Sequence, residues 1–93
     1  MSLEKSIHII YSGSVQGVGF RFAAESVARR IGVSGYVKNL PDGSVETVCE
    51  GTKVQLDDFL KDMETRMDGY VRNANVYWQP ATGRYNGFEI RFY

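Results

Sequence analysis

The residues of this chain that are best suited to chemistry lie close to its N-terminus. Residues 13–19 read Gly-Ser-Val-Gln-Gly-Val-Gly, called the glycine-rich loop below, and Arg21 follows two positions later. An alternating run at residues 6–12, typical of a β-strand, precedes this loop, and an apolar-periodic run at residues 20–31, typical of a helix, follows it. A loop in this position directs backbone N–H groups at an anion, and an arginine fork matches two phosphate oxygens. The segment therefore predicts a binding site for one phosphoryl group.

A simpler interpretation of the same residues stays open at this point. The glycine-rich loop matches neither the P-loop pattern nor the dinucleotide fingerprint, and a generic loop of this composition is more often a tight turn beside a surface arginine. Asn39 is a second polar residue with two interpretations, because it stands just before a Pro-Asp-Gly turn, where asparagine is commonly a turn-former. Residue types alone therefore favour a structural role for Arg21 and for Asn39.

The order of residues adds information that the composition of these segments does not carry. Val-Gln-Gly-Val-Gly-Phe-Arg at residues 15–21, preceded by Gly13, resembles the signature of the acylphosphatase family. Gly-Tyr-Val-Lys-Asn at residues 35–39, followed by Asp-Gly-Ser-Val-Glu at residues 42–46, is similar to the second signature of that family. Gly-Phe-Glu-Ile at residues 87–90 resembles its closing strand. The resemblance thus covers nearly the whole chain.

This resemblance implies an enzyme that hydrolyses acyl phosphates, with inorganic phosphate as product and inhibitor. The phosphate-holding arginine of the family falls on Arg21 and its water-orienting asparagine on Asn39. The backbone amides expected to bind the phosphoryl group are those of Val15, Gln16, Gly17, Val18, Gly19 and Phe20. A carboxylate is a weakly basic leaving group, so the reaction needs charge stabilisation and positioning but no general acid. We therefore expect neither a metal nor another cofactor to take part.

Composition limits the other classes of function. The 93 residues are enough for one domain, which we expect at residues 5–93. Eleven basic and eleven acidic side chains give a formal net charge of zero, so no overall charge attracts nucleic acid or an anionic membrane. Cys49 is the single cysteine, so the chain cannot form an intrachain disulfide, which fits a reducing cytoplasm. One cysteine and one histidine together cannot supply a typical metal site. No apolar run is long enough for a membrane span. We expect a cytoplasmic monomer.

The hydrophobic pattern predicts a ferredoxin-like α+β sandwich, in which two helices cover one face of a mostly antiparallel sheet and a short fifth strand follows the βαββαβ order. The strands are expected at residues 6–12, 35–40, 44–50, 70–79 and 87–92, and the helices at residues 20–31 and from a Thr52–Gln55 capping box to Gly69. Residues 1–5 are expected to be a frayed lead-in. His8 is expected on one face of the first strand, and the sequence predicts no interaction partner for its side chain.

Two other functions fit this order of elements. Acylphosphatase-like domains also occur as non-catalytic modules for acyl or carbamoyl phosphate within larger proteins, although this chain ends where a lone domain is expected to end. The RNA recognition module shares the βαββαβ order, but the chain lacks its aromatic motif and a basic balance. We therefore expect a small-molecule acyl phosphate as the partner, with neither nucleic acid nor a membrane.

Overall fold

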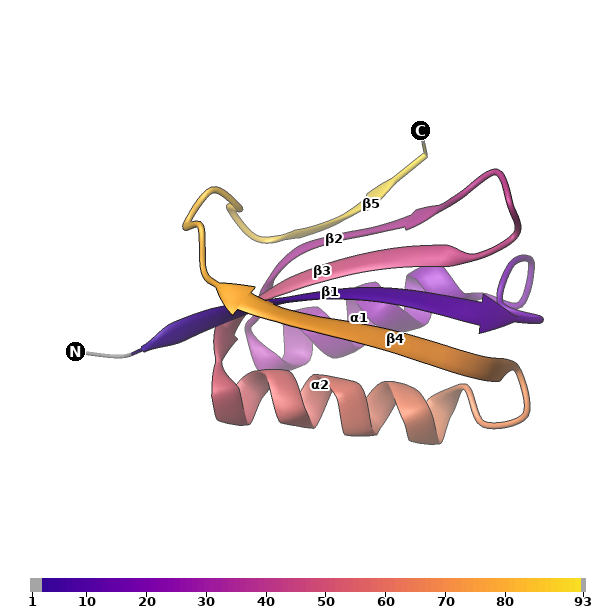
Figure 1. Cartoon of the computed structure of the whole chain (residues 1–93), viewed down its shortest axis with the longest axis horizontal. Helices are drawn as coiled ribbons and strands as arrows, with labels where there is room; N and C mark the ends of the chain where they lie inside the picture. The colour runs from indigo at the N-terminus through magenta and orange to yellow at the C-terminus, as the bar shows by residue number, and fades with distance from the viewer. Residues whose placement is uncertain (1–2, 93) are drawn as a thin grey trace.

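A five-stranded sheet with two helices on one face makes up the computed structural model, which describes residues 3–92 (Figure 1). The elements follow in the order β1 (Glu4–Gly13), α1 (Phe20–Ile31), β2 (Ser34–Asn39), β3 (Val45–Thr52), α2 (Lys53–Arg66), β4 (Val71–Pro80) and β5 (Phe88–Arg91). Their order across the sheet is β4-β1-β3-β2-β5, and every neighbouring pair is antiparallel except β2 with β5. The predicted ferredoxin-like α+β architecture is confirmed, including its short C-terminal strand.

Alternation along the strands decides which side chains face the helices. Ile7 and Ile9 of β1 are fully buried, whereas His8 between them is only partly buried. The helices cover this inner face with their apolar stripes, which are Phe20, Ala24, Val27 and Ala28 from α1 and Leu56, Phe59 and Met63 from α2. Val37 of β2 is also fully buried, so Asn39, two positions further on, points to the same side of the sheet.

Several predicted boundaries shift by one to three residues, and one prediction is wrong. Glu4 and Lys5 do not fray, because they pair with Thr52 and Gly51 of β3; residues 1–2 of the expected lead-in lie outside the described residues. The sequence missed this because neither residue is apolar, while strand pairing uses only their backbone. The capping box of α2 is confirmed, since Gln55 N–H donates to Thr52 Oγ1 and Thr52 N–H donates to Gln55 Oε1.

The outer face of the sheet carries a polar cluster of three side chains that the sequence did not predict. His8 Nε2 lies 2.9 Å from Glu46 Oε2, and the Tyr36 hydroxyl donates to Glu46 Oε1 at 2.9 Å. Burial raises the pKa of Tyr36 to about 12, and its hydrogen bond to the Glu46 carboxylate acts in the same direction. These partners come from β1, β2 and β3, so only the register of the sheet brings them together.

A buried carboxylate fixes the connection between β4 and β5. Glu50 is 3% exposed and accepts hydrogen bonds from Thr82 N–H, the Thr82 hydroxyl and Gly83 N–H, each at 2.9 Å. Burial raises the pKa of Glu50, but these donors lower it by more, so the pKa lies below its usual value. Glu50 thereby holds the segment that leads into β5 and on to Phe92.

Candidate functional site

The glycine-rich loop joins the end of β1 to the start of α1. Gly17 and Gly19 adopt positive φ angles of 77° and 78°, a conformation that other residues rarely take. Gly19 is the N-cap of α1, and it offers no side chain to accept from the N–H groups of the first turn. The first turn also contains no acidic residue. These amides, at the positive end of the helix dipole, therefore remain available to an anion.

Arg21 lies in the first turn of α1, at the edge of this loop. Its Cζ atom is 5.0 Å from the centroid of the Phe92 ring, which follows β5. Within residues 3–92, no carboxylate forms an ion pair with Arg21. The phenyl ring supports one face of the guanidinium by a cation–π contact, and the N–H groups at the edge of the guanidinium make no hydrogen bond to any of residues 3–92.

Asn39 is the last residue of β2. Its amide oxygen Oδ1 is buried, and no hydrogen-bond donor of the described residues reaches it. The turn that follows is held by other groups: Leu40 N–H donates to Ser44 O, and the Ser44 N–H and hydroxyl both donate to Asp42. The hydrogen bonds from Ser44 also hold the pKa of Asp42 below its usual value. The turn bonds that this structure contains therefore do not use the Asn39 side chain.

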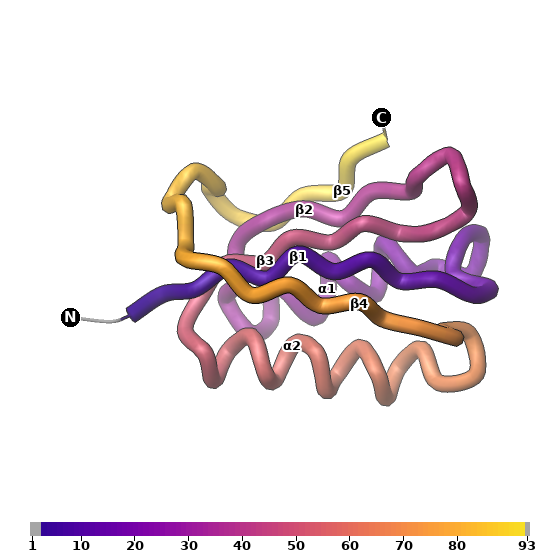
Figure 2. The backbone as a smooth tube through the Cα atoms, viewed as in Figure 1, coloured from indigo at the N-terminus to yellow at the C-terminus, as the bar shows by residue number. Residues whose placement is uncertain are grey.

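The side chain of Gln16 connects the glycine-rich loop to this turn. No pattern in the sequence predicted this contact. Its side-chain amide donates to Leu40 O and to Ser44 O, both at 2.8 Å. The loop and the turn lie at the same end of the molecule, where β1 and β2 both end (Figure 2). Two hydrogen bonds from one side chain thus fix the position of the loop relative to Asn39.

The loop, the helix start and the end of β2 enclose a hollow of about 250 Å³, called the Arg21 hollow below. Its lining consists of Val15, Gly17, Gly19, Phe20, Arg21, Phe22 and Asn39. Of the residues predicted for phosphate binding, Gln16 and Val18 are not in this lining, while Phe22 was not predicted. One water occupies only ~30 Å³ in the liquid, so the hollow has room for a phosphoryl group and a water. With one cation and no carboxylate, its lining suits an anion.

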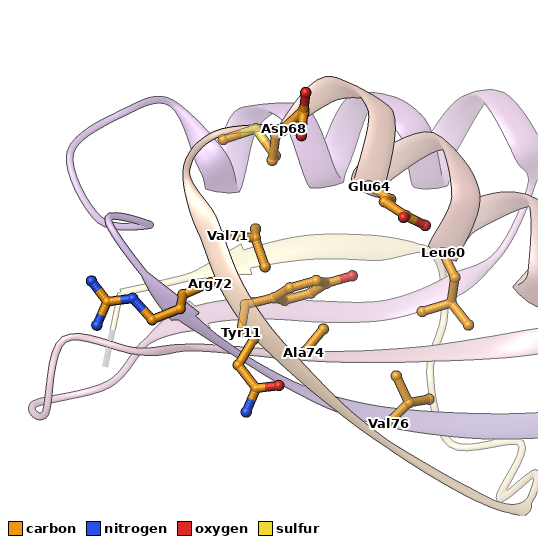
Figure 3. Close-up of a pocket in the computed structure, with 10 residues that line it drawn as sticks. Tyr11, Leu60, Glu64, Asp68, Val71, Arg72, Ala74 and Val76 are labelled. Atoms are coloured by element: carbon orange, nitrogen blue, oxygen red, sulfur yellow. The ribbon is translucent and has the colours of Figure 1, made fainter.

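A larger hollow of about 450 Å³ lies between α2 and β4 and contains none of the predicted site residues (Figure 3). Glu64 and Asp68 line it on the helix side and Arg72 on the strand side. Two carboxylates against one guanidinium disfavour a phosphate there. Tyr11 also lines this hollow, but its hydroxyl oxygen is covered and has no partner in the described part of the chain.

Other kinds of site find little support in residues 3–92. No group of three or more His, Cys, Asp or Glu side chains is placed to hold a metal ion. Cys49 is fully buried, and burial raises the pKa of its thiol. No helix in this part of the chain is long and apolar enough to cross a membrane.

Known proteins are similar to this chain along most of its length. A family model described as acylphosphatase matches residues 7–90. An acylphosphatase of Archaeoglobus fulgidus is 48% identical over 88 residues, which cover 94% of this chain and 98% of that protein. One of Rubrobacter xylanophilus is 42% identical over 88 residues, which cover 94% of this chain and 80% of that protein.

Solved structures show the same relationship. The crystal structure of acylphosphatase from Bacillus subtilis matches with a TM-score of 0.87 at 31% identity, over 94% of this chain and 98% of that one. The structure of T. kodakarensis HypF matches with a TM-score of 0.81 at 30% identity, over 94% of this chain but only 12% of the HypF chain. The family match spans both signature motifs and most of every strand of the sheet. The chain therefore belongs to the acylphosphatase family of hydrolytic enzymes.

Proposed function

We propose that Arg21 and the backbone amides of residues 15–20 bind the phosphoryl group of an acyl phosphate, and that Asn39 positions the water that attacks it. The observation that carries this proposal is that Asn39 lines the same hollow as the guanidinium of Arg21, and that no hydrogen bond within residues 3–92 uses its side chain. A water in the hollow that hydrogen-bonds to the Asn39 side chain would have an oxygen lone pair free to face the phosphorus.

The chemistry needs few protein groups. The water oxygen forms a bond to phosphorus, the bond from phosphorus to the acyl oxygen breaks, and its electron pair leaves with the carboxylate. One proton of the water passes to a phosphoryl oxygen and the other stays on the attacking oxygen, so the products are a carboxylate and protonated inorganic phosphate. Arg21 and the amides stabilise charge on the equatorial oxygens. Asn39 orients the nucleophile but does not remove its proton, because an amide is not a base at neutral pH.

The acyl phosphate is bound as a small molecule, and inorganic phosphate competes for the same hollow. We further propose one domain at residues 5–93 that acts as a monomer in the cytoplasm, without nucleic acid or a membrane. The single buried thiol supports a reducing compartment, and the zero formal net charge supports the absence of a polyanionic partner.

Replacement of Arg21 tests the phosphate site. Arg21→Ala should raise KM and lower kcat for benzoyl phosphate, because the guanidinium contacts the phosphoryl group before and during transfer. Arg21→Lys should restore little activity, since an ammonium cannot form two parallel hydrogen bonds. Arg84→Ala, in the loop after β4, is a matched control that should leave both constants unchanged.

The outcome also separates the proposal from its alternative. Phosphate release by the unmodified protein, lost in Arg21→Ala, supports hydrolysis. Binding of inorganic phosphate without turnover of any acyl phosphate would instead favour a non-catalytic acyl- or carbamoyl-phosphate module. Turnover of Arg21→Lys at the rate of the unmodified protein would contradict binding through two parallel hydrogen bonds.

A further inference from the structure

Phe22 lines the Arg21 hollow although it was not predicted there. It follows Arg21 directly in the first turn of α1, and 68% of the side chain is exposed. An exposed phenylalanine adds almost nothing to the free energy of folding, because its ring keeps most of its contact with water. Ligand sites combine apolar and aromatic side chains with a few polar groups, and this ring stands beside Arg21 and Asn39 in the lining of one hollow.

The chemistry of the proposed substrate determines where its second half must lie. The acyl group is joined to the phosphoryl group through one oxygen, so it emerges at the mouth of the hollow when the phosphoryl group is held inside. In-line attack places the leaving oxygen on the side of the phosphorus opposite the water. Asn39 reaches the hollow from the sheet, whereas Phe22 reaches it from α1. With the water at Asn39, the acyl group leaves on the opposite side of the phosphorus, and Phe22 is the exposed large apolar side chain among the lining residues that can meet it there.

We propose that Phe22 is a specificity-determining residue that contacts the acyl group, and that the enzyme prefers flat, apolar acyl groups such as benzoyl to acetyl. An aromatic acyl group can pack against the Phe22 ring in an offset or edge-to-face arrangement and remove apolar surface from water. The lining of the hollow holds no cation besides Arg21, which the phosphoryl group engages. An acyl group with a second carboxylate thus finds no charge partner among these residues. This inference rests on the proposed function and identifies the substrate class for it.

Phe92 supplies an internal comparison, because it is also exposed, at 71%, and also lies beside Arg21. Its ring supports the guanidinium, which binds the part that all acyl phosphates share. Loss of Phe92 should therefore affect every substrate by a similar factor. Loss of Phe22 should change the ratio between substrates.

The kinetic test compares benzoyl phosphate with acetyl phosphate in three proteins. The unmodified enzyme should show the higher kcat/KM with benzoyl phosphate, and Phe22→Ala should reduce this preference roughly tenfold, as expected for the loss of one apolar contact. Phe92→Ala should lower both values of kcat/KM and keep their ratio. An unchanged ratio in Phe22→Ala, or a changed ratio in Phe92→Ala alone, would overturn the inference. Unfolding midpoints of the variants exclude a general loss of structure.

A binding test makes failure of this inference distinguishable from failure of the proposed function. Phenylphosphonate and methylphosphonate carry the same anionic head and cannot be hydrolysed by this route. In NMR titrations, phenylphosphonate should bind roughly tenfold more tightly than methylphosphonate to the unmodified protein, and this difference should largely disappear in Phe22→Ala. Equal affinities in both proteins would refute the role of Phe22, whatever the catalytic assay shows. Turnover of neither acyl phosphate would instead refute the proposed function.

Discussion

Asn39→Ala separates a water-positioning asparagine from a turn-forming one, because the two roles predict opposite results. If Asn39 positions the nucleophile, its loss should lower kcat by about 10²-fold or more, as expected when a reacting group loses its orientation. In energy this equals about 2.7 kcal/mol of transition-state stabilisation. KM should change little, since the amide contacts the water and not the phosphoryl group.

The structure also predicts the effect of Asn39→Ala on stability. Because Oδ1 has no donor, the substitution breaks no hydrogen bond of the described chain and removes one buried, unpaired acceptor. This gain opposes the small loss of packing, so the free energy of unfolding should change by less than about 1 kcal/mol. A turn-forming side chain with two hydrogen bonds would lose about 2 kcal/mol on the same change.

One preparation suffices for the assay. Benzoyl phosphate hydrolysis gives kcat and KM, and a urea titration gives the free energy of unfolding. Asn75→Ala, at an exposed position of β4, is the control and should leave all three values unchanged. An Asn39→Ala protein that unfolds at lower urea yet keeps a normal kcat would refute the water-positioning role.

Three further predictions follow from the hydrogen bonds and charges. Gln16→Ala removes the two bonds to Leu40 O and Ser44 O, so kcat should fall by roughly tenfold and stability by about 1–2 kcal/mol, whereas Gln79→Ala should change neither. The pKa of Glu50 is lowered in the folded protein, so its contribution to stability is complete above the unfolded-state pKa of about 4.3 and is lost as pH falls through the folded-state value. Acid unfolding of Glu50→Gln should therefore depend less steeply on pH than that of the unmodified protein or of Glu64→Gln, and equal slopes would contradict this account. Activity should survive dialysis against EDTA, and a loss that magnesium restores would show that Arg21 and the amides do not suffice.

The fold followed from the sequence because its signals are local and repeated. Alternation in β1, the apolar stripe of α1 and the capping box at Thr52 and Gln55 each act within a few residues. The parallel pairing of β2 with β5 has no such signal, since it depends on where the chain returns after β4. Glu4 and Lys5 were missed for a related reason, because their pairing partners in β3 determine their conformation.

The site residues that could be predicted also differ from the others in having a local signal in the sequence. Arg21, Asn39 and the glycine-rich loop stand in motifs that are continuous in the sequence, and the structure brings Arg21, Asn39 and part of the loop to one hollow. Gln16, Phe92 and Glu50 contribute through partners far along the chain, at Leu40, Arg21 and Thr82 respectively. Contacts of this kind require the tertiary arrangement, and one sequence holds no pattern that predicts them.

An unpaired buried polar atom is not by itself evidence of function, and three such atoms in residues 3–92 show why. Thr47 Oγ1 and the Tyr11 hydroxyl are buried without partners, as is Asn39 Oδ1. Thr47 is surrounded by the core, and Tyr11 borders a hollow whose carboxylates outnumber its cation. Only Asn39 shares a hollow with a guanidinium and with helix amides that no side chain caps. The argument for catalysis therefore depends on the hollow that Asn39 lines, which offers a place for an anion and room for a water.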